Sequence, residues 1–478
     1  MSGVVRAPET LAAPAAPETL AAPESLAAPE SLAAPESLAA PEPPEDLRAP
    51  EDLRAPEDPG TPGAPGAPGA PGARKWPEPV VLLIEDEAAL VALVARARKA
   101  STLAVDVEAN GLFAYRCRLC TVQIAFMEEE TSSGGTLVTA IVDALCTPLA
   151  PLAALLGPEG PVKVLHDLAF DARMLDEAGV RLGRVRDTAV AGLFLGAKAT
   201  GLSALLQSEV GVKLDKRLQH HDWGQRPLGP EQIGYLAADV QHLLELDARL
   251  AEQAAALGVE EEIAEECAYR LETAHRPPRD VRPAYARVKG VEGLDAVGRA
   301  VLRRAVTVRE ALGEAEDVPS FQVVRSEALL ALAKRRPDSL EALAALEGFG
   351  AGRAAQHAKA WLGAVADGIA DGDVPEEERA LIAGEPVDAE AIARFKTLAA
   401  RRKALVGKIG RWRSAEAQRR CVCEQVVLPG HCVQELAALG VKGERGLAAV
   451  AQVQGLGARR LAMYGAALAS LLEGAERR

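Results

Sequence analysis

The sequence predicts an α/β domain, a mixed β-sheet with flanking helices, that follows a disordered N-terminal tail and precedes two all-α domains. Between residues 80 and 142, segments with apolar residues at every second position come one after another; later strands alternate with helical segments. From about Leu257 onward the pattern is helical only. The first 75 residues are a proline-rich, low-complexity sequence without aromatic residues.

The predicted tail repeats the unit Leu-Ala-Ala-Pro-Glu-Ser and ends in Gly-Ala-Pro triplets. Sixteen of the 32 prolines lie in its first 75 residues, and prolines this frequent break helices. Nothing large and apolar is available to fill a solenoid core, so we expect residues 1–77 to be disordered.

Within the α/β part, residues 78–258, a strand at Val80–Ile84 precedes a helix that begins near Asp86 and ends near Ala100. The next strand, Leu103–Ala109, alternates Leu103, Val105 and Val107 with polar or small residues. The turn Asn110-Gly111 follows it. Further strands are expected at Tyr115–Phe126, Thr136–Val142 and Val162–Leu165, and helices at Leu149–Leu156, from 167 to Gly179, after Thr188, at Leu202–Val210 and from Pro230.

The amino-acid composition and charge of the chain limit the classes of protein to which it can belong. Hydrophobic residues make up 49% of the chain, enough for real cores, although aromatic residues make up only 3%. The net charge of −14 argues against a phosphate-binding protein, but the first 75 residues hold 12 acidic and 5 basic residues and so account for half of it. Seven cysteines form no disulfide framework, which favours a reducing cytosol, and no signal peptide or apolar run of about 18 residues is evident.

Four carboxylates and one phenol are expected to converge. Asp106 and Glu108 are two apart on one strand and share a face, and Asp171 follows a later strand. Tyr235 and Asp239 are four apart on one helix face. Carboxylates in apolar surroundings need a cation, and hard oxygen ligands favour Mg²⁺ or Mn²⁺. Two such ions roughly 3.5–4 Å apart would suit phosphodiester hydrolysis.

These residues resemble a known family. Val105-Asp-Val-Glu108, Lys163-Val-Leu-His166 with Asp171, and Tyr235-Leu-Ala-Ala-Asp239 resemble the exonuclease motifs of the DEDD superfamily, tyrosine branch. Leu214-Asp-Lys216 and Asp222–Leu228 are similar to the ribonuclease D family. The resemblance implies a ribonuclease-H-like fold, with Asp106 on both metals, Glu108 and Asp239 completing the tighter site, Asp171 on the second metal and the Tyr235 hydroxyl holding the attacking water.

The helical part resembles the HRDC module, the helicase and ribonuclease D C-terminal domain. Asp317–Val324 and Ala333–Pro337 carry the resemblance in residues 284–368, where Val308 replaces the usual tryptophan. After an acidic linker at about 370–386, residues 388–474 look like a second, more diverged copy. Each copy has a glycine-rich turn, Leu346–Arg353 and Val453–Arg459, that can present backbone N–H groups to a phosphate.

Several other residues of the sequence have structural interpretations that require no role in catalysis. His166 is expected to hydrogen-bond locally and Asp187 to cap the helix after it. Cys117 and Cys120 lack a second ligand pair, and the cluster of Cys421, Cys423, His431 and Cys432 is a weak zinc candidate whose default is ordinary thiols. A basic run surrounds Trp412 and fits either a solvated helix face or a phosphate-contacting patch: Lys396, Arg401, Arg402, Lys403, Lys408, Arg411, Arg413, Arg419 and Arg420.

The resemblance therefore predicts a cytoplasmic, metal-dependent 3′-to-5′ exoribonuclease that removes 3′ nucleotides from structured RNA such as tRNA precursors. The same motifs serve exonucleases that act on single-stranded DNA, and the distinction depends on contacts to the 2′-hydroxyl. The alternative from another class is a non-catalytic nucleic-acid-binding scaffold. No membrane partner is expected.

Overall fold

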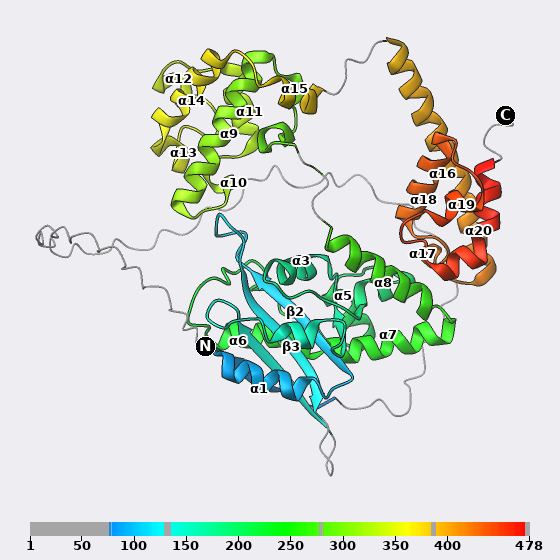
Figure 1. Cartoon of the computed structure of the whole chain (residues 1–478). Coiled ribbons are helices and arrows are strands. Elements are labelled where there is room, and N and C mark those ends of the chain that lie inside the picture. The colour runs from blue at the N-terminus through cyan, green and yellow to red at the C-terminus, as the bar shows by residue number, and fades with distance from the viewer. Residues whose placement is uncertain are drawn as a thin grey trace, which may run out of the picture. The chain divides into compact units, whose positions relative to one another are not determined.

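A computed structural model describes residues 76–473 apart from 78, 129–134, 277–279, 281 and 384–388, so the predicted tail lies almost wholly outside the described residues. Six strands form one sheet in the order β1-β4-β3-β2-β5-β6. β3 pairs antiparallel with β2 and β4, and the other pairs are parallel, which confirms the predicted mixed sheet (Figure 1). The strands are β1 (Val80–Ile84), β2 (Thr102–Ala109), β3 (Leu119–Glu128), β4 (Thr136–Asp143), β5 (Val162–Leu165) and β6 (Val185–Asp187).

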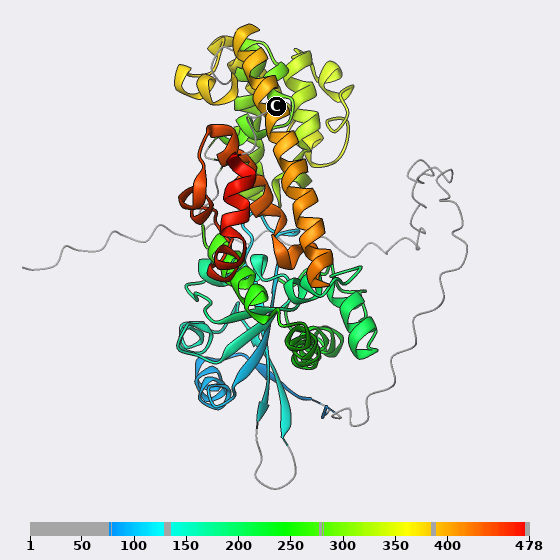
Figure 2. The ribbon, with the colours of Figure 1, turned by 90° about the vertical axis from the view of Figure 1, so that its right-hand side faces the viewer.

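Helices cover both faces of the sheet, as the turned view shows (Figure 2). Leu103, Val105 and Val107 of β2 pack with α1, α2 and α3, whereas Ala104 packs with α5 and α7 on the other face. The helices of this domain are α1 (Glu87–Ala97), α2 (Leu152–Leu156), α3 (Ala169–Glu177), α4 (Thr188–Phe194), α5 (Leu202–Leu205), the π-helix η2 (Leu206–Val210), α6 (Pro230–Gln241), α7 (Leu243–Leu257) and α8 (Glu260–Ala274).

Several predicted boundaries were wrong for identifiable reasons. β3 begins at Leu119 rather than Tyr115, because the buried Asn110 closes residues 110–118 into a loop: its N–H donates to the Arg118 carbonyl and its Oδ1 accepts from the Arg118 N–H. The predicted helix at 202–210 ends in a π-helical turn. Leu271 and Ala274 of α8, which follow the predicted domain end at 258, pack into the core beneath the sheet.

The first helical domain has its own core around Trp361, Leu329 and Phe349. It extends beyond 368 into the predicted linker, where Ile382 of α15 packs on this core and Glu378 pairs with Arg303 at 2.9 Å. Its helices are the 3₁₀ turns η3 (Ala284–Arg287) and η4 (Val291–Gly293), then α9 (Ala296–Glu316), α10 (Ser320–Val323), α11 (Ser326–Arg335), α12 (Leu340–Ala344), α13 (Gly352–Gln356), α14 (Ala358–Asp371) and α15 (Glu376–Ala383).

The C-terminal helical domain, α16–α20, is all-α as predicted, with a core that includes Ile409, Leu436 and Leu468. Among the described residues, no helix combines the length and apolar character needed to cross a membrane. The helices are α16 (Ala389–Arg420), α17 (Glu424–Val427), α18 (Gly430–Lys442), α19 (Gly446–Ala451) and α20 (Ala458–Glu473).

Candidate active site

Asp106 and Glu108 lie in the part of β2 that extends beyond its neighbour β5. β5 pairs only with Thr102–Ala104, whereas β3 pairs along the whole of β2, with Asp106 opposite Gln123. Side chains alternate along a strand, so Asp106 and Glu108 lie on the face of Ala104, away from the core formed by Val105 and Val107. The short partner strand therefore leaves one edge of β2 unpaired beside both carboxylates.

α6 supplies the third carboxylate. The helix begins at Pro230, and the Gln232 side chain accepts a hydrogen bond from the Gly229 N–H at 2.9 Å, which fixes its first turn. α6 packs on β2, β3 and β4. As a result, one carboxylate oxygen each of Asp106, Glu108 and Asp239 lies within 4.8 Å of the other two.

Asp171 approaches from a different element. It lies in the first turn of α3, which follows β5, and it is only 5% exposed. It does not belong to the group of three, but burial and the nearby Asp106 carboxylate raise its pKa well above the ordinary value. The site is thus a tight group of three carboxylates with a fourth beside it.

The carboxylates repel one another's charge when no cation is bound. Burial raises the pKa of Asp106 to about 7. Burial, then the neighbouring carboxylates, raise the pKa of Glu108 to about 9 and that of Asp239 to about 8. Without a cation, these carboxyl groups cannot all be ionised near neutral pH. Divalent cations prefer such oxygen ligands and would take the place of the protons.

Tyr235 is close enough to the same carboxylates to feel their charge. Burial and the charges of Asp239 and Glu108 raise the pKa of its phenol above the usual value near 10. Its ring packs against Trp223, with 5.7 Å between ring centroids. The hydroxyl therefore stays protonated near neutral pH, so it can orient a reacting group but cannot serve as a base.

The stretch that precedes α6 is fixed to the sheet by one ion pair. Arg226 donates to both oxygens of Asp143, at 2.5 and 2.8 Å, and to the backbone carbonyls of Cys120 and Trp223 at 2.9 and 2.8 Å. Asp143 ends β4 and its side chain is 4% exposed. This pair holds Trp223, and with it the ring that Tyr235 packs against.

Two polar side chains near the site were not predicted. Thr121 and Gln123 are fully buried on β3, opposite Glu108 and Asp106, and Gln123 donates to Thr121 at 2.7 Å. The Gln123 Oε1 has no hydrogen-bond partner among the described residues. Polar residues at every second position of an otherwise apolar strand were the signal that could have identified them.

His166 and Asp187 have the local roles expected of them. The His166 Nδ1 lies 2.9 Å from the Thr188 hydroxyl. Asp187 caps α4 by accepting from the backbone N–H groups of Ala189 and Val190, and it also accepts from those of Asp167 and Leu168. Asp187 thereby fixes the chain between β5 and α3, and so helps to place Asp171.

The cysteine candidates do not converge on a metal. The three site carboxylates make up the one metal-competent group found in the described part of the chain. His431 contacts Glu266 at 3.1 Å and the Cys432 sulfur at 3.5 Å, whereas Cys421 contacts a backbone carbonyl. All seven cysteines lie in the described ranges and are free.

The basic run lies on α16, where only part of it is available to a ligand. Trp412 packs edge-on against Tyr464 with 5.4 Å between centroids, as part of the domain core. Arg419 pairs with Glu416 and Arg420 with Glu262. Exposed cations remain toward the other end of the run, among them Lys396, Arg401 and Lys403.

Comparison with known proteins agrees with this architecture. A 3′-5′ exonuclease family matches residues 81–255, and the HRDC domain family matches residues 298–365. Ribonuclease D of Acidiphilium cryptum is 32% identical over 68% of this chain and 82% of its own, and that of Gluconacetobacter diazotrophicus is 29% identical over 64% and 76%.

Solved structures show the same fold. A protein from Bifidobacterium adolescentis superposes with a TM-score of 0.65 at 20% identity, over 82% of this chain and 97% of its own. Escherichia coli RNase D, described as an exoribonuclease involved in structured RNA processing, gives 0.57 at 22% identity over 82% and 99%.

The fold and its matches thus define a 3′-5′ exonuclease joined to an HRDC domain. The chain belongs to the ribonuclease D family and is a 3′-5′ exoribonuclease. The likeness of the C-terminal helical domain to a second HRDC copy stays a prediction.

Proposed function

We propose that this exoribonuclease removes 3′ nucleotides from structured RNA, such as tRNA precursors, and releases nucleoside 5′-monophosphates. Its cofactors would be two divalent cations, Mg²⁺ or Mn²⁺, held by Asp106, Glu108, Asp171 and Asp239. The observation that carries the proposal is the group of three carboxylates, whose oxygens lie within 4.8 Å of one another with Asp171 alongside. The seven free cysteines support the cytoplasm as its compartment.

Each site residue would have a separate role in hydrolysis, according to its position. Bound cations would polarise the scissile phosphate and stabilise the charge on the attacking and leaving oxygens. Asp106 would contact both ions, as the family resemblance implies, and its charge raises the pKa of both Asp239 and Asp171, which supports this role. Tyr235 keeps its proton, and its hydroxyl would position the attacking water.

The test is hydrolysis of a 5′-labelled RNA and the DNA of the same sequence, each with Mg²⁺, Mn²⁺ or a chelator. We expect a ladder of one-nucleotide steps from the 3′ end of RNA that is absent with chelator and in the Asp106→Asn and Glu108→Gln variants. Glu87→Gln is the matched control, since Glu87 is an exposed glutamate of α1 in the same domain.

Other outcomes would overturn parts of the proposal. A ladder on DNA alone would make the protein a DNA exonuclease. Binding of RNA without a ladder in either metal would leave a nucleic-acid-binding scaffold. Full activity of Glu108→Gln would remove this carboxylate from the metal site.

A further inference from the structure

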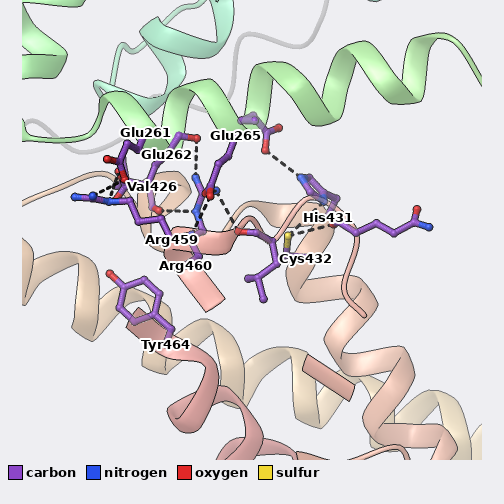
Figure 3. A network of polar contacts seen from close by, with 12 residues as sticks. Glu261, Glu262, Glu265, Val426, His431, Cys432, Arg459, Arg460 and Tyr464 are labelled. Atoms are coloured by element: carbon purple, nitrogen blue, oxygen red, sulfur yellow. Dashed lines mark hydrogen bonds and ion pairs between the residues drawn. The ribbon is translucent and has the colours of Figure 1, made fainter. Parts of the chain in front are cut away.

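One face of α8 carries four glutamates, and this acidic face meets the C-terminal helical domain. Figure 3 shows three of them beside the basic residues that begin α20 (Figure 3). Glu262 and Glu266 are almost fully buried, at 0% and 3% exposure, although carboxylates normally stay in water. The acidic face consists of Glu261, Glu262, Glu265 and Glu266.

The glycine-rich turn before α20 holds one of these carboxylates. The backbone N–H of Arg459, in the first turn of the helix, donates to Glu265 Oε1 at 2.9 Å. Gly457 has φ +81°, and a Cβ on it would lie 2.0 Å from the same carboxylate. The turn therefore encloses the Glu265 carboxylate so closely that a side chain at 457 would displace it. An anion held by N–H groups at a helix N-terminus is the usual mode of phosphate binding.

Two arginine side chains add further donors around the glutamates that this turn contacts. Arg460 Nη1 lies 3.3 Å from Glu265 Oε2, and Arg459 Nη1 lies 2.6 Å from Glu261 Oε2. Arg460 is fully buried, and the carbonyl of Val426, in its own domain, accepts from its Nε at 2.9 Å. Arg460 also donates to the Glu262 backbone carbonyl of α8 at 3.1 Å, and neither of these two bonds depends on a glutamate side chain. A backbone N–H with two guanidinium groups is a set of donors suited to a phosphate.

Ion pairs form a large part of the contact between α8 and this domain. The apolar cluster shared across it has one fully buried residue from the C-terminal domain, Val426, which packs with Val190 and Phe194. The charged contacts include Arg420 with Glu262 and His431 with Glu266, and the His431 ring also stacks on Tyr269 of α8 with 4.2 Å between ring centroids. Charged contacts of this kind weaken in the presence of salt or a competing polyanion.

We propose that the turn Gly455–Arg459, together with the Arg459 and Arg460 side chains, is a nucleic-acid phosphate site that α8 occupies from within the chain. Glu265 takes the position of the phosphate. RNA that binds the C-terminal domain there must first displace α8, so the exonuclease domain itself limits how strongly its partner domain holds RNA. The inference rests on RNA as the ligand, but it does not require cleavage.

The test measures the dissociation constant of a labelled single-stranded RNA in the presence of chelator, where no cleavage occurs. Glu265→Gln keeps the shape of the side chain and removes the competing charge, so we expect binding at least about threefold tighter, because a larger fraction of the turns is free. Glu260→Gln is the control: Glu260 is exposed on the same helix, and its side chain forms no hydrogen bond or ion pair with α20 among the described residues. It should leave the constant unchanged.

The Arg459→Ala variant tests whether the tighter RNA binding arises at this turn. In the wild-type background its effect should be small, since Arg459 is already engaged by Glu261. In the Glu265→Gln background it should return the constant to the wild-type value. An unchanged constant in Glu265→Gln, or a gain that survives Arg459→Ala, would overturn the proposal. Ladder formation with Mg²⁺ by the same preparations tests the proposed hydrolysis separately.

Discussion

The ion pair between Arg226 and Asp143 allows a stability prediction with a magnitude. Asp143 is 4% exposed at its side chain, so Arg226→Met leaves a buried carboxylate without a counter-charge. Breaking such a pair from one side costs about 3–5 kcal/mol. The carbonyls of Cys120 and Trp223 lose a donor in the same substitution. We expect the α/β domain to lose stability of this order, with the other domains unaffected.

Amide hydrogen exchange of the β3 and β4 peptides measures this loss inside the full chain. A cost of about 3–5 kcal/mol corresponds to exchange faster by two to nearly four orders of magnitude, if these amides exchange by unfolding of the domain. Asp143→Asn and the double variant complete a mutant cycle, in which the double variant should lose less than the two single losses combined. Peptides from α16–α20 serve as the internal reference.

The pH dependence gives a second check on the same reasoning. Burial opposes ionisation of Asp143, but hydrogen bonds from Arg226 and the Leu145 N–H hold its pKa below the ordinary value. Without Arg226 the pKa of this carboxyl should rise above its unfolded value, so the damage grows as pH rises from about 4 to 8. A loss below about 1 kcal/mol at neutral pH, or no coupling in the cycle, would refute the argument.

Further predictions concern the site and the turn before α20. Tyr235→Phe should lower kcat about 10²-fold with KM unchanged in steady-state RNA hydrolysis; a raised KM alone would assign Tyr235 to substrate binding instead. In metal-free protein the raised pKa values of Glu108, about 9, and Asp239, about 8, keep extra protons on the folded state. Its melting temperature should therefore fall between pH 6 and 9, and Mn²⁺ should abolish the fall; a rise would contradict the shifts. Gly457→Ala should lower stability by at least about 1 kcal/mol in thermal unfolding, because its φ is +81° and its Cβ would meet Glu265; Glu265→Ala should restore part of that loss.

The sequence predicted those features that depend on local pattern. Alternation along β2 placed Asp106 and Glu108 on one face, and helical spacing placed Tyr235 and Asp239 together. Their convergence needed the family motifs, because strand order and the short reach of β5 do not follow from periodicity.

Features set by tertiary contacts were missed. The loop before β3 is closed by Asn110, eight residues from its partner Arg118. α8 follows the predicted domain end at 258, and the packing of its Leu271 and Ala274 on the core of the α/β domain does not follow from helical periodicity. The sequence indicates that the glycine turn can present N–H groups to a phosphate, but the glutamate that occupies it lies 194 residues away in the chain.

That separation has a consequence for how the protein is made. Every strand of the sheet, through Asp187, leaves the ribosome long before α20 does. Glu261, Glu262 and Glu265 of α8 therefore emerge before the arginines of α20 that later pair with them, whereas Glu266 already has Arg270 four residues further on. Closing so long a loop costs little more entropy than closing a shorter one, but it happens last. The nascent chain would hold an assembled nuclease site before its internal competitor has a partner.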